Sequence, residues 1–269
     1  MFDSGNLGLI FLAVQRIKET PQMQSMNPVF NEKTFAQTPA VRGDAMTVEG
    51  ATNKSIIAVL LCLAAGIFAF NLNPAMIMPF AIGGSIIGFI MVIAASFKPQ
   101  WSPVITPLYA VVEGLALGAI SLAIGSVGAV EESGFSSLPI QAVLLTFTIL
   151  FAMLTIYRTG LIKVTERMRM ILVGCLFAIF ATYMVSFIMG FFGTQIPYIH
   201  GSGPIGILFS LAVVGVASFF LLLDFDNIER GARMGAPKYM EWYSALGLLV
   251  TLVWLYLEVL KLLAKIQRR

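Results

Sequence analysis

The sequence predicts an all-α integral membrane protein with seven transmembrane helices, and two observations support this fold class. Hydrophobic residues make up 58% of the 269 residues and charged residues only 12%, whereas about a quarter of the residues in a soluble domain are charged. The chain also contains seven apolar runs of roughly 20 residues, which is the length of helix that crosses a bilayer core. This composition excludes a soluble enzyme, a disordered chain and a nucleic-acid-binding protein.

The apolar runs are continuous, which favours helices over a membrane β-barrel with its alternating strands. The connections between the runs are short, so little chain remains for a second domain. We therefore expect a polar N-terminal tail over residues 1–54 and one transmembrane domain over residues 55–269. The predicted spans are residues 55–72, 75–97, 104–128, 138–157, 170–192, 203–225 and 242–263.

The tail precedes the first span and differs from the rest of the chain. It contains five basic and five acidic residues, and its apolar patch from Leu7 to Val14 is too short to cross a membrane. The flanks of that patch also do not suit a signal peptide, because Asp3 precedes it and Arg16 follows it. We expect this tail to be partly disordered.

The later spans carry local signals of their own. Pro79 predicts a kink in the second span, and Pro103 marks the start of the third. Gly114 and Gly118, four residues apart, predict close helix packing along the third span. The fourth and fifth spans are joined by a basic segment, "YRTGLIKVTERMRM" (residues 157–170), that we expect to meet anionic lipid head groups.

The distribution of Lys and Arg predicts the orientation. Thirteen of the 17 basic residues lie in the tail or in the connections on its side of the membrane, and the loops on the other side contain none. The N-terminus is therefore expected in the cytoplasm. The remaining four basic residues follow the seventh span. A complete seventh crossing places them outside, against the tendency of Lys and Arg to lie on the cytoplasmic side. We expect that crossing to be complete.

The chain carries no sign of enzymatic or cofactor chemistry. Cys62 and Cys175 both lie inside apolar runs, which excludes a disulfide framework and a multi-cysteine metal site. No phosphate-binding loop, serine-hydrolase motif or HExxH motif occurs. We expect a protein that is not an enzyme and has no resident cofactor, and whose surroundings are the lipid bilayer.

Acidic residues inside the apolar runs are the candidate functional residues, because a charge at mid-bilayer costs on the order of 3 kcal/mol. Glu113 lies about nine residues into the third span, Asp224 and Asp226 close the sixth, and Glu258 lies late in the seventh. For Asp226 a solvated helix end competes with function, and for Glu258 an i,i+3 pair with Lys261 does so. For Glu113, which lies too deep for its charge to reach the membrane surface, a function or a structural buried pair is favoured, and for Asp224 a function is favoured.

Simple geometry favours Glu113 as a partner for Asp224. An antiparallel hairpin of the last two helices places Glu258 about 15 Å above Asp224, too far for a direct bond. Two carboxylates that share a dry site cannot both ionise cheaply, so a pair of Glu113 and Asp224 predicts a proton-operated latch. When deprotonated, such a pair offers the hard oxygen ligands that suit Ca²⁺.

Four segments together resemble the transmembrane Bax inhibitor motif family, in its bacterial branch. They are "NPVFNEKTF" before the first span, "EGLALGAIS" in the third, "LLLDFDNIE" at the end of the sixth, and a leucine-rich pattern over residues 245–263. The resemblance implies a bundle in which the last helix is central and wrapped by the other six. It also implies a pH-sensitive Ca²⁺ leak in which an aspartate on the sixth helix and one on the seventh share a proton.

The chain departs from that pattern at one of the two aspartates. Asp224 matches the sixth-helix aspartate, but Thr251 stands where the seventh-helix aspartate is expected, and Gly247 occupies the other position that is often acidic. Three explanations stay open: Glu113 substitutes for the missing acid, Glu258 does so, or this branch conducts differently.

The sequence thus predicts a pH-sensitive Ca²⁺ leak channel of the bacterial plasma membrane, gated by protonation of intramembrane carboxylates, with Ca²⁺ or H⁺ as the ion. The alternative is a membrane interaction protein that restrains a membrane protease or other integral proteins without conducting ions. A proton-coupled transporter would show broken helices in two matching halves, which are not evident. A retinal protein would need a mid-helix lysine in the last span, and Lys261 and Lys265 lie too near its end.

Overall fold

The computed structural model describes residues 45–127, 137–192, 201 and 203–268. Within these residues the structure consists of helices and one isolated β-bridge, and seven helices are long and apolar enough to cross a membrane. The predicted fold class is therefore confirmed, whereas tail residues 1–44 lie outside the described residues. The elements are α3 (Val48–Ala69), α4 (Pro74–Phe97), the short 3₁₀ helix η1 (Pro99–Trp101), α5 (Ser102–Val127), α6 (Leu138–Thr159), α7 (Glu166–Phe191), α9 (Pro204–Arg233) and α10 (Met240–Gln267).

Local sequence accounts for where several helices begin and end. The side chains of Thr47, Asn73 and Thr165 accept hydrogen bonds from backbone N–H groups in the first turns of α3, α4 and α7. Gly160 ends α6 with a φ of 68°, a left-handed conformation that glycine adopts without steric cost.

Two helices, α3 and α9, extend furthest beyond the spans predicted from hydropathy. Helix α3 begins at Val48 rather than at residue 55, and α9 continues past residue 225 to Arg233. The extra turns contain polar and charged residues, which hydropathy does not count as membrane-spanning. They remain helical because a cap or an ion pair stabilises them, such as the pair between Asp226 and Arg230 one turn apart.

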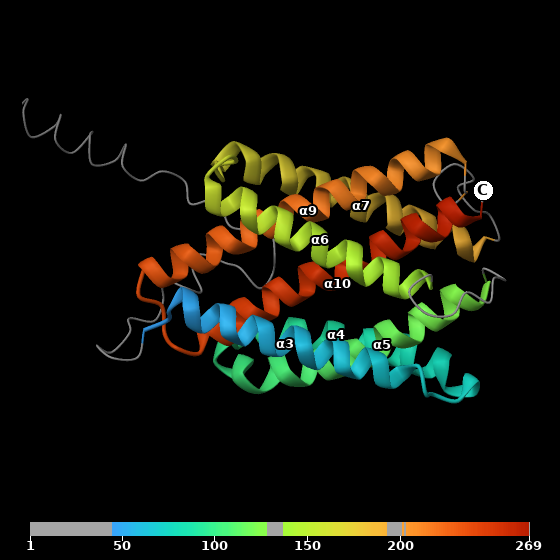
Figure 1. Ribbon diagram of the computed structural model, residues 1–269, viewed down its shortest axis with the longest axis horizontal. Helices are drawn as coiled ribbons and strands as arrows, with labels where there is room; N and C mark the ends of the chain where they lie inside the picture. The colour runs from blue at the N-terminus through green and yellow to red at the C-terminus, as the bar shows by residue number, and fades with distance from the viewer. Residues whose placement is uncertain (1–44, 128–136, 193–200, 202, 269) are drawn as a thin grey trace, which may run out of the picture.

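The seventh helix is central, as the family resemblance implied. Helix α10 runs between a layer of α3, α4 and α5 and a layer of α6, α7 and α9 (Figure 1). Of its most apolar 18-residue window 72% is buried, compared with 11% for α7 and 17% for α4. The wrapping by the other six is unequal, however, because α3, α5, α6 and α9 form the main packing against α10. The other two helices lie outside, α4 against α5 and α7 against α9.

Close packing of α3 against α5 depends on glycines. A Cβ atom at Gly114 would overlap the backbone carbonyl of Cys62, and one at Gly118 would overlap that of Gly66. The close contact that the sequence predicts at Gly114 and Gly118 is thus confirmed. The absence of side chains lets the two backbones approach closely. The van der Waals packing that results is one of the forces that hold helices together in lipid.

The two ends of the bundle differ. Helix α10 is continuous, so the described part of the chain crosses the bundle seven times, and it begins and finishes at opposite ends of the bundle (Figure 1). We call the end formed by the starts of α3, α5, α7 and α10 the basic end, because most of the basic residues gather there. The other end is called the far end below.

Candidate functional site

Asp224 lies in the protein core, on α9. Asp224 is 1% exposed and shares a helix face with Ala217, Leu221 and Ile228. These three residues belong to the same core cluster as the buried residues of α10. The spacing of these four positions, at intervals of four, three and four residues, is that of one helical stripe. The structure therefore places an ionisable carboxyl group on the buried face of α9.

Glu113 lies in the other layer, on α5, and is 7% exposed. Its carboxyl group faces α4, where a Cβ atom at Gly88 would overlap it, and the ring of Tyr109 lies beside the same glycine. Gly88 thus leaves the space that the Glu113 carboxyl occupies. Within the part of the chain that the structure describes, Glu113 has no hydrogen-bonding or ion-pair partner.

The structure does not bring Glu113 and Asp224 together. Helix α5 belongs to one layer and α9 to the other, with α10 between them, and these two helices are not among the pairs with substantial packing contact. The carboxylate pair proposed from the sequence thus gains no support from the geometry, and we treat Glu113 and Asp224 as two separate buried carboxyl groups. Among the described residues, no group of three or more His, Cys, Asp or Glu side chains is arranged to hold a metal ion.

Asp226 has a structural role at the basic end. Its carboxylate binds the guanidinium of Arg169 on α7 and accepts a second interaction from Arg230 at 2.7 Å. Glu166 lies 3.6 Å from Arg230 and 3.9 Å from Arg169, so two acids and two bases form a network between α7 and α9. Arg169 is buried, and Asp226 neutralises it.

Glu258 is paired at the far end of α10. It accepts hydrogen bonds from the hydroxyl of Tyr183 on α7 at 2.9 Å and from the ammonium of Lys261 at 2.8 Å. The i,i+3 pair considered from the sequence is therefore present. One turn further on, Lys265 donates to the carbonyl of Gly206 and to the hydroxyl of Ser210, which ties α10 to the start of α9.

Thr251 is buried on α10, and its hydroxyl donates to the carbonyl of Gly247 at 3.3 Å. Ser244, Gly247 and Thr251 share one face of α10 by their spacing, so this stretch of the central helix presents two hydroxyl groups and a glycine rather than a carboxylate. The position at which the family resemblance expects a second aspartate therefore carries no charge.

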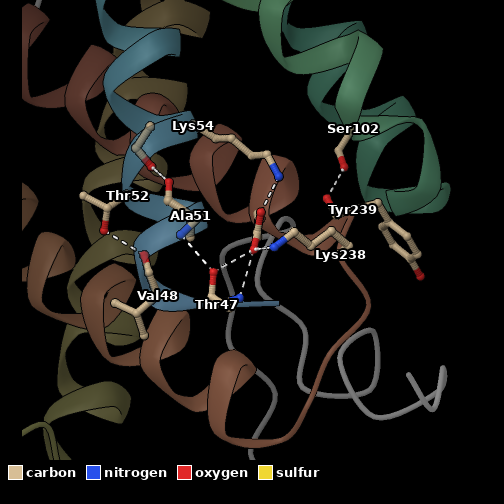
Figure 2. Close-up of polar contacts among 11 residues, drawn as sticks. Thr47, Val48, Ala51, Thr52, Lys54, Ser102, Lys238 and Tyr239 are labelled. Atoms are coloured by element: carbon tan, nitrogen blue, oxygen red, sulfur yellow. Dashed lines mark hydrogen bonds and ion pairs between the residues drawn. The ribbon is translucent and has the colours of Figure 1, made fainter. Parts of the chain in front are cut away.

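A buried cluster at the basic end was missed by sequence reasoning. Glu241, in the first turn of α10, is 1% exposed, and Figure 2 shows Thr47, Lys54 and Lys238 converging at this point. Its carboxylate accepts hydrogen bonds from the backbone N–H and the hydroxyl of Thr47 at 2.9 and 3.0 Å. It also pairs with the ammonium groups of Lys54 and, at 2.8 Å, Lys238. We call these four residues the Glu241 clamp.

Backbone contacts extend this clamp. Met46 donates its N–H to the carbonyl of Ala236 at 2.6 Å, next to the bridge between Ala45 and Pro237. From α5, the hydroxyl of Ser102 donates to the carbonyl of Tyr239 (Figure 2). The turn between α9 and α10 is thus fastened to the segment before α3 and to the start of α5. One sign of this cluster in the sequence is Glu241, which follows Lys238 by three residues and directly precedes the seventh predicted span.

Of the comparisons with known proteins, one found no match and another identifies a family. No curated protein matches the chain. The family described as Bax inhibitor 1 like matches residues 27–268, which cover all seven spanning helices and the Glu241 clamp. The chain therefore belongs to the Bax inhibitor 1 like family.

Proposed function

We propose that this protein is an ion leak channel of the bacterial plasma membrane, with its N-terminus in the cytoplasm, and that protonation of buried carboxyl groups controls it. The observation that carries the proposal is Asp224, an ionisable group in the core of a membrane bundle beside the central helix. A membrane-buried acid of this kind marks an ion or proton pathway by default. Membership of the Bax inhibitor 1 like family is consistent with this function.

Protonation of Asp224 gives a physical basis for gating. Burial penalises the carboxylate more than the neutral acid, and the carboxylate gains stability from water, a cation or further hydrogen-bond donors. Ionisation therefore favours a state in which α9 moves relative to α10 and admits water. In that state the carboxylate offers a hard oxygen ligand to a passing Ca²⁺ ion. We thus expect ion flux to rise as pH rises and Asp224 loses its proton.

Glu113 is a second buried acid, in the other layer. Because Gly88 and the α4–α5 interface surround it, its ionisation would disturb the packing of α4 on α5 rather than that of α9 on α10. We assign Asp224 the main role and Glu113 a separate contribution. Asp226 and Glu258 already have cationic partners, so they are stabilising groups in this scheme.

Calcium flux in proteoliposomes tests the proposal. Purified protein is reconstituted into vesicles that contain a calcium-sensitive dye, and uptake is measured from acidic to mildly alkaline pH. We expect Asp224→Asn, which mimics the protonated acid, to give low flux at every pH. Glu49→Gln, at an exposed position in the first turn of α3, is the matched control and should conduct like the unchanged protein.

The double variant Glu113→Gln with Asp224→Asn gives the decisive comparison. If it folds, as judged by helix content and a single elution peak, and still shows unchanged flux with an unchanged pH profile, the proposal is wrong. A variant with Thr251→Asp restores the acid that the family resemblance expects on α10. We expect it to shift the pH at which the flux changes, because a second carboxyl group on the central helix then competes for the proton.

A further inference from the structure

A cavity of about 330 Å³ lies between α3, α5, α6 and α10. Its lining is apolar except for a few groups that already have partners. The hydroxyls of Ser121 and Tyr256 bind one another at 2.7 Å, Ser121 also donates to the carbonyl of Leu117, and Thr146 donates to that of Ala142. Because these polar groups already have partners, the cavity offers few hydrogen bonds to a water molecule, and a buried water needs two or more.

The arrangement of the two layers creates this cavity. Helices α3 and α6 both pack against α10, but they are not among the pairs with substantial contact. Gly114 and Gly118 let α3 approach α5 closely, and with Gly66 they contribute no side chains to fill the space. Part of the cavity wall is therefore the bare backbone of α3 and α5.

The mouth of the cavity is continuous with the lipid-facing surface of the bundle. Among the lining residues, Ile67 on α3 is 68% exposed and Leu144 on α6 is 53% exposed. Both lie within helices that are long and apolar enough to cross a membrane, so the opening is on the side of the bundle that lipid would cover. The molecules that meet this opening are the acyl chains of the surrounding lipids.

We propose that this cavity binds one acyl chain of a bilayer phospholipid. Its volume lies at the lower end of the range of small-molecule pockets, which suits part of a single chain. No hydrophobic effect drives the chain in from lipid, but an unfilled void leaves its lining without dispersion contacts, and a flexible chain supplies them.

The bound chain would touch the central helix. Leu249, Leu252, Val253 and Tyr256 form the α10 side of the cavity, on either side of Thr251 in the sequence. Occupancy therefore stabilises α10 in the position that the structure shows. The binding itself does not depend on ion conduction, so this inference stands or fails separately from the proposed function.

Photolabelling in vesicles tests the proposal. The protein is reconstituted in phosphatidylethanolamine and phosphatidylglycerol with a trace of phospholipid that carries a diazirine on one acyl chain, and labelled peptides are identified by mass spectrometry. We expect label concentrated on cavity-lining segments of α3, α6 and α10. Val143→Phe, which fills the cavity from α6, should reduce this label several-fold. Leu208→Phe, at a lipid-exposed position of α9 outside the cavity, should leave it unchanged.

A second filling variant covers the case in which Val143→Phe fails to fold. Leu63→Phe narrows the same cavity from α3 and should give the same several-fold reduction. Even labelling of all lipid-facing helices, including α4 and α7, with no decrease in either folded filling variant would overturn the proposal. Strong labelling of α10 that survives both substitutions would overturn it as well, because the chain would then lie elsewhere.

Discussion

Buried charged residues at the basic end have partners on neighbouring helices. Glu241 illustrates this, since a carboxylate that is almost completely buried has two ammonium groups and two donors of Thr47 around it. The backbone also makes room for it, because a Cβ atom at Gly50 would overlap the carboxylate. Removing one partner of a buried ion pair is more costly than the pair's net contribution, because a charge remains without compensation.

We therefore expect Glu241→Gln to destabilise the protein by about 1–3 kcal/mol. This is below the roughly 3–5 kcal/mol typical of a fully buried pair, because the side chains of Lys54 and Lys238 are 19% and 48% exposed and can reach water. Thermal unfolding in detergent, followed by circular dichroism, measures the change. Glu49→Gln, an exposed acid of the same helix turn as Gly50, should unfold like the unchanged protein, and equal midpoints for both variants would contradict the role of the clamp.

At the scale of elements, α7 is the helix held by the fewest contacts. It packs mainly on α9, and much of its polar attachment is the network of Glu166, Arg169, Asp226 and Arg230 at the basic end. At the far end, Tyr183 attaches it to Glu258 of α10. Because lipid offers no hydrophobic driving force between helices, such polar contacts and close packing fix the position of an outer helix.

Asp226→Asn should loosen α7 at its basic end, because it leaves the buried guanidinium of Arg169 without its main counter-charge. We expect faster amide hydrogen exchange in the first turns of α7 and little change in α3 or α5. Glu166→Gln is the matched control. Its acid is 55% exposed and lies 3.6 to 3.9 Å from its partners, so its removal should cost no more than about 1 kcal/mol. Unchanged exchange in Asp226→Asn would show that apolar packing alone holds α7.

The limits of sequence reasoning follow from the distance along the chain between interacting residues. The seven spans were predictable because hydropathy is a local property, and the Glu258–Lys261 pair was readable from its i,i+3 spacing. The Glu241 clamp was not, because Thr47 and Lys54 lie 194 and 187 positions from Glu241. The same limit explains why the sequence suggested Glu113 as a partner of Asp224. The depth of each acid in the membrane can be predicted from its position along its helix. The layer of the bundle to which that helix belongs depends on contacts between distant segments, and it cannot be predicted in this way.

For the whole molecule, α10 is the element that joins the two layers. Its side chains contribute many of the most buried apolar residues, among them Tyr243, Leu246 and Leu255. The direct contacts between the layers are fewer than those that each layer makes with α10. The stability of the bundle should therefore depend more on α10 than on any outer helix.

Leu255→Ala tests this dependence. Leu255 is fully buried, so truncation leaves a cavity at the centre of the bundle and should cost about 2–5 kcal/mol. Leu211→Ala removes the same atoms from a position of α9 that is 55% exposed, and it should change stability by no more than about 0.5 kcal/mol. Denaturant titration in detergent compares the two variants, and similar midpoints would show that α10 is not the main source of stability.

The central position of α10 also has a consequence for biogenesis. A ribosome completes this segment after the other six helices, so those six enter the bilayer before the element that holds their two layers together exists. Until then the carbonyl of Ala236 and the carboxylate of Glu241 are not available to the segment around Met46 and Thr47. Insertion of α10 therefore has to place an apolar helix between two layers that are already in the bilayer, and a translation product that stops before α10 lacks the helix that joins them.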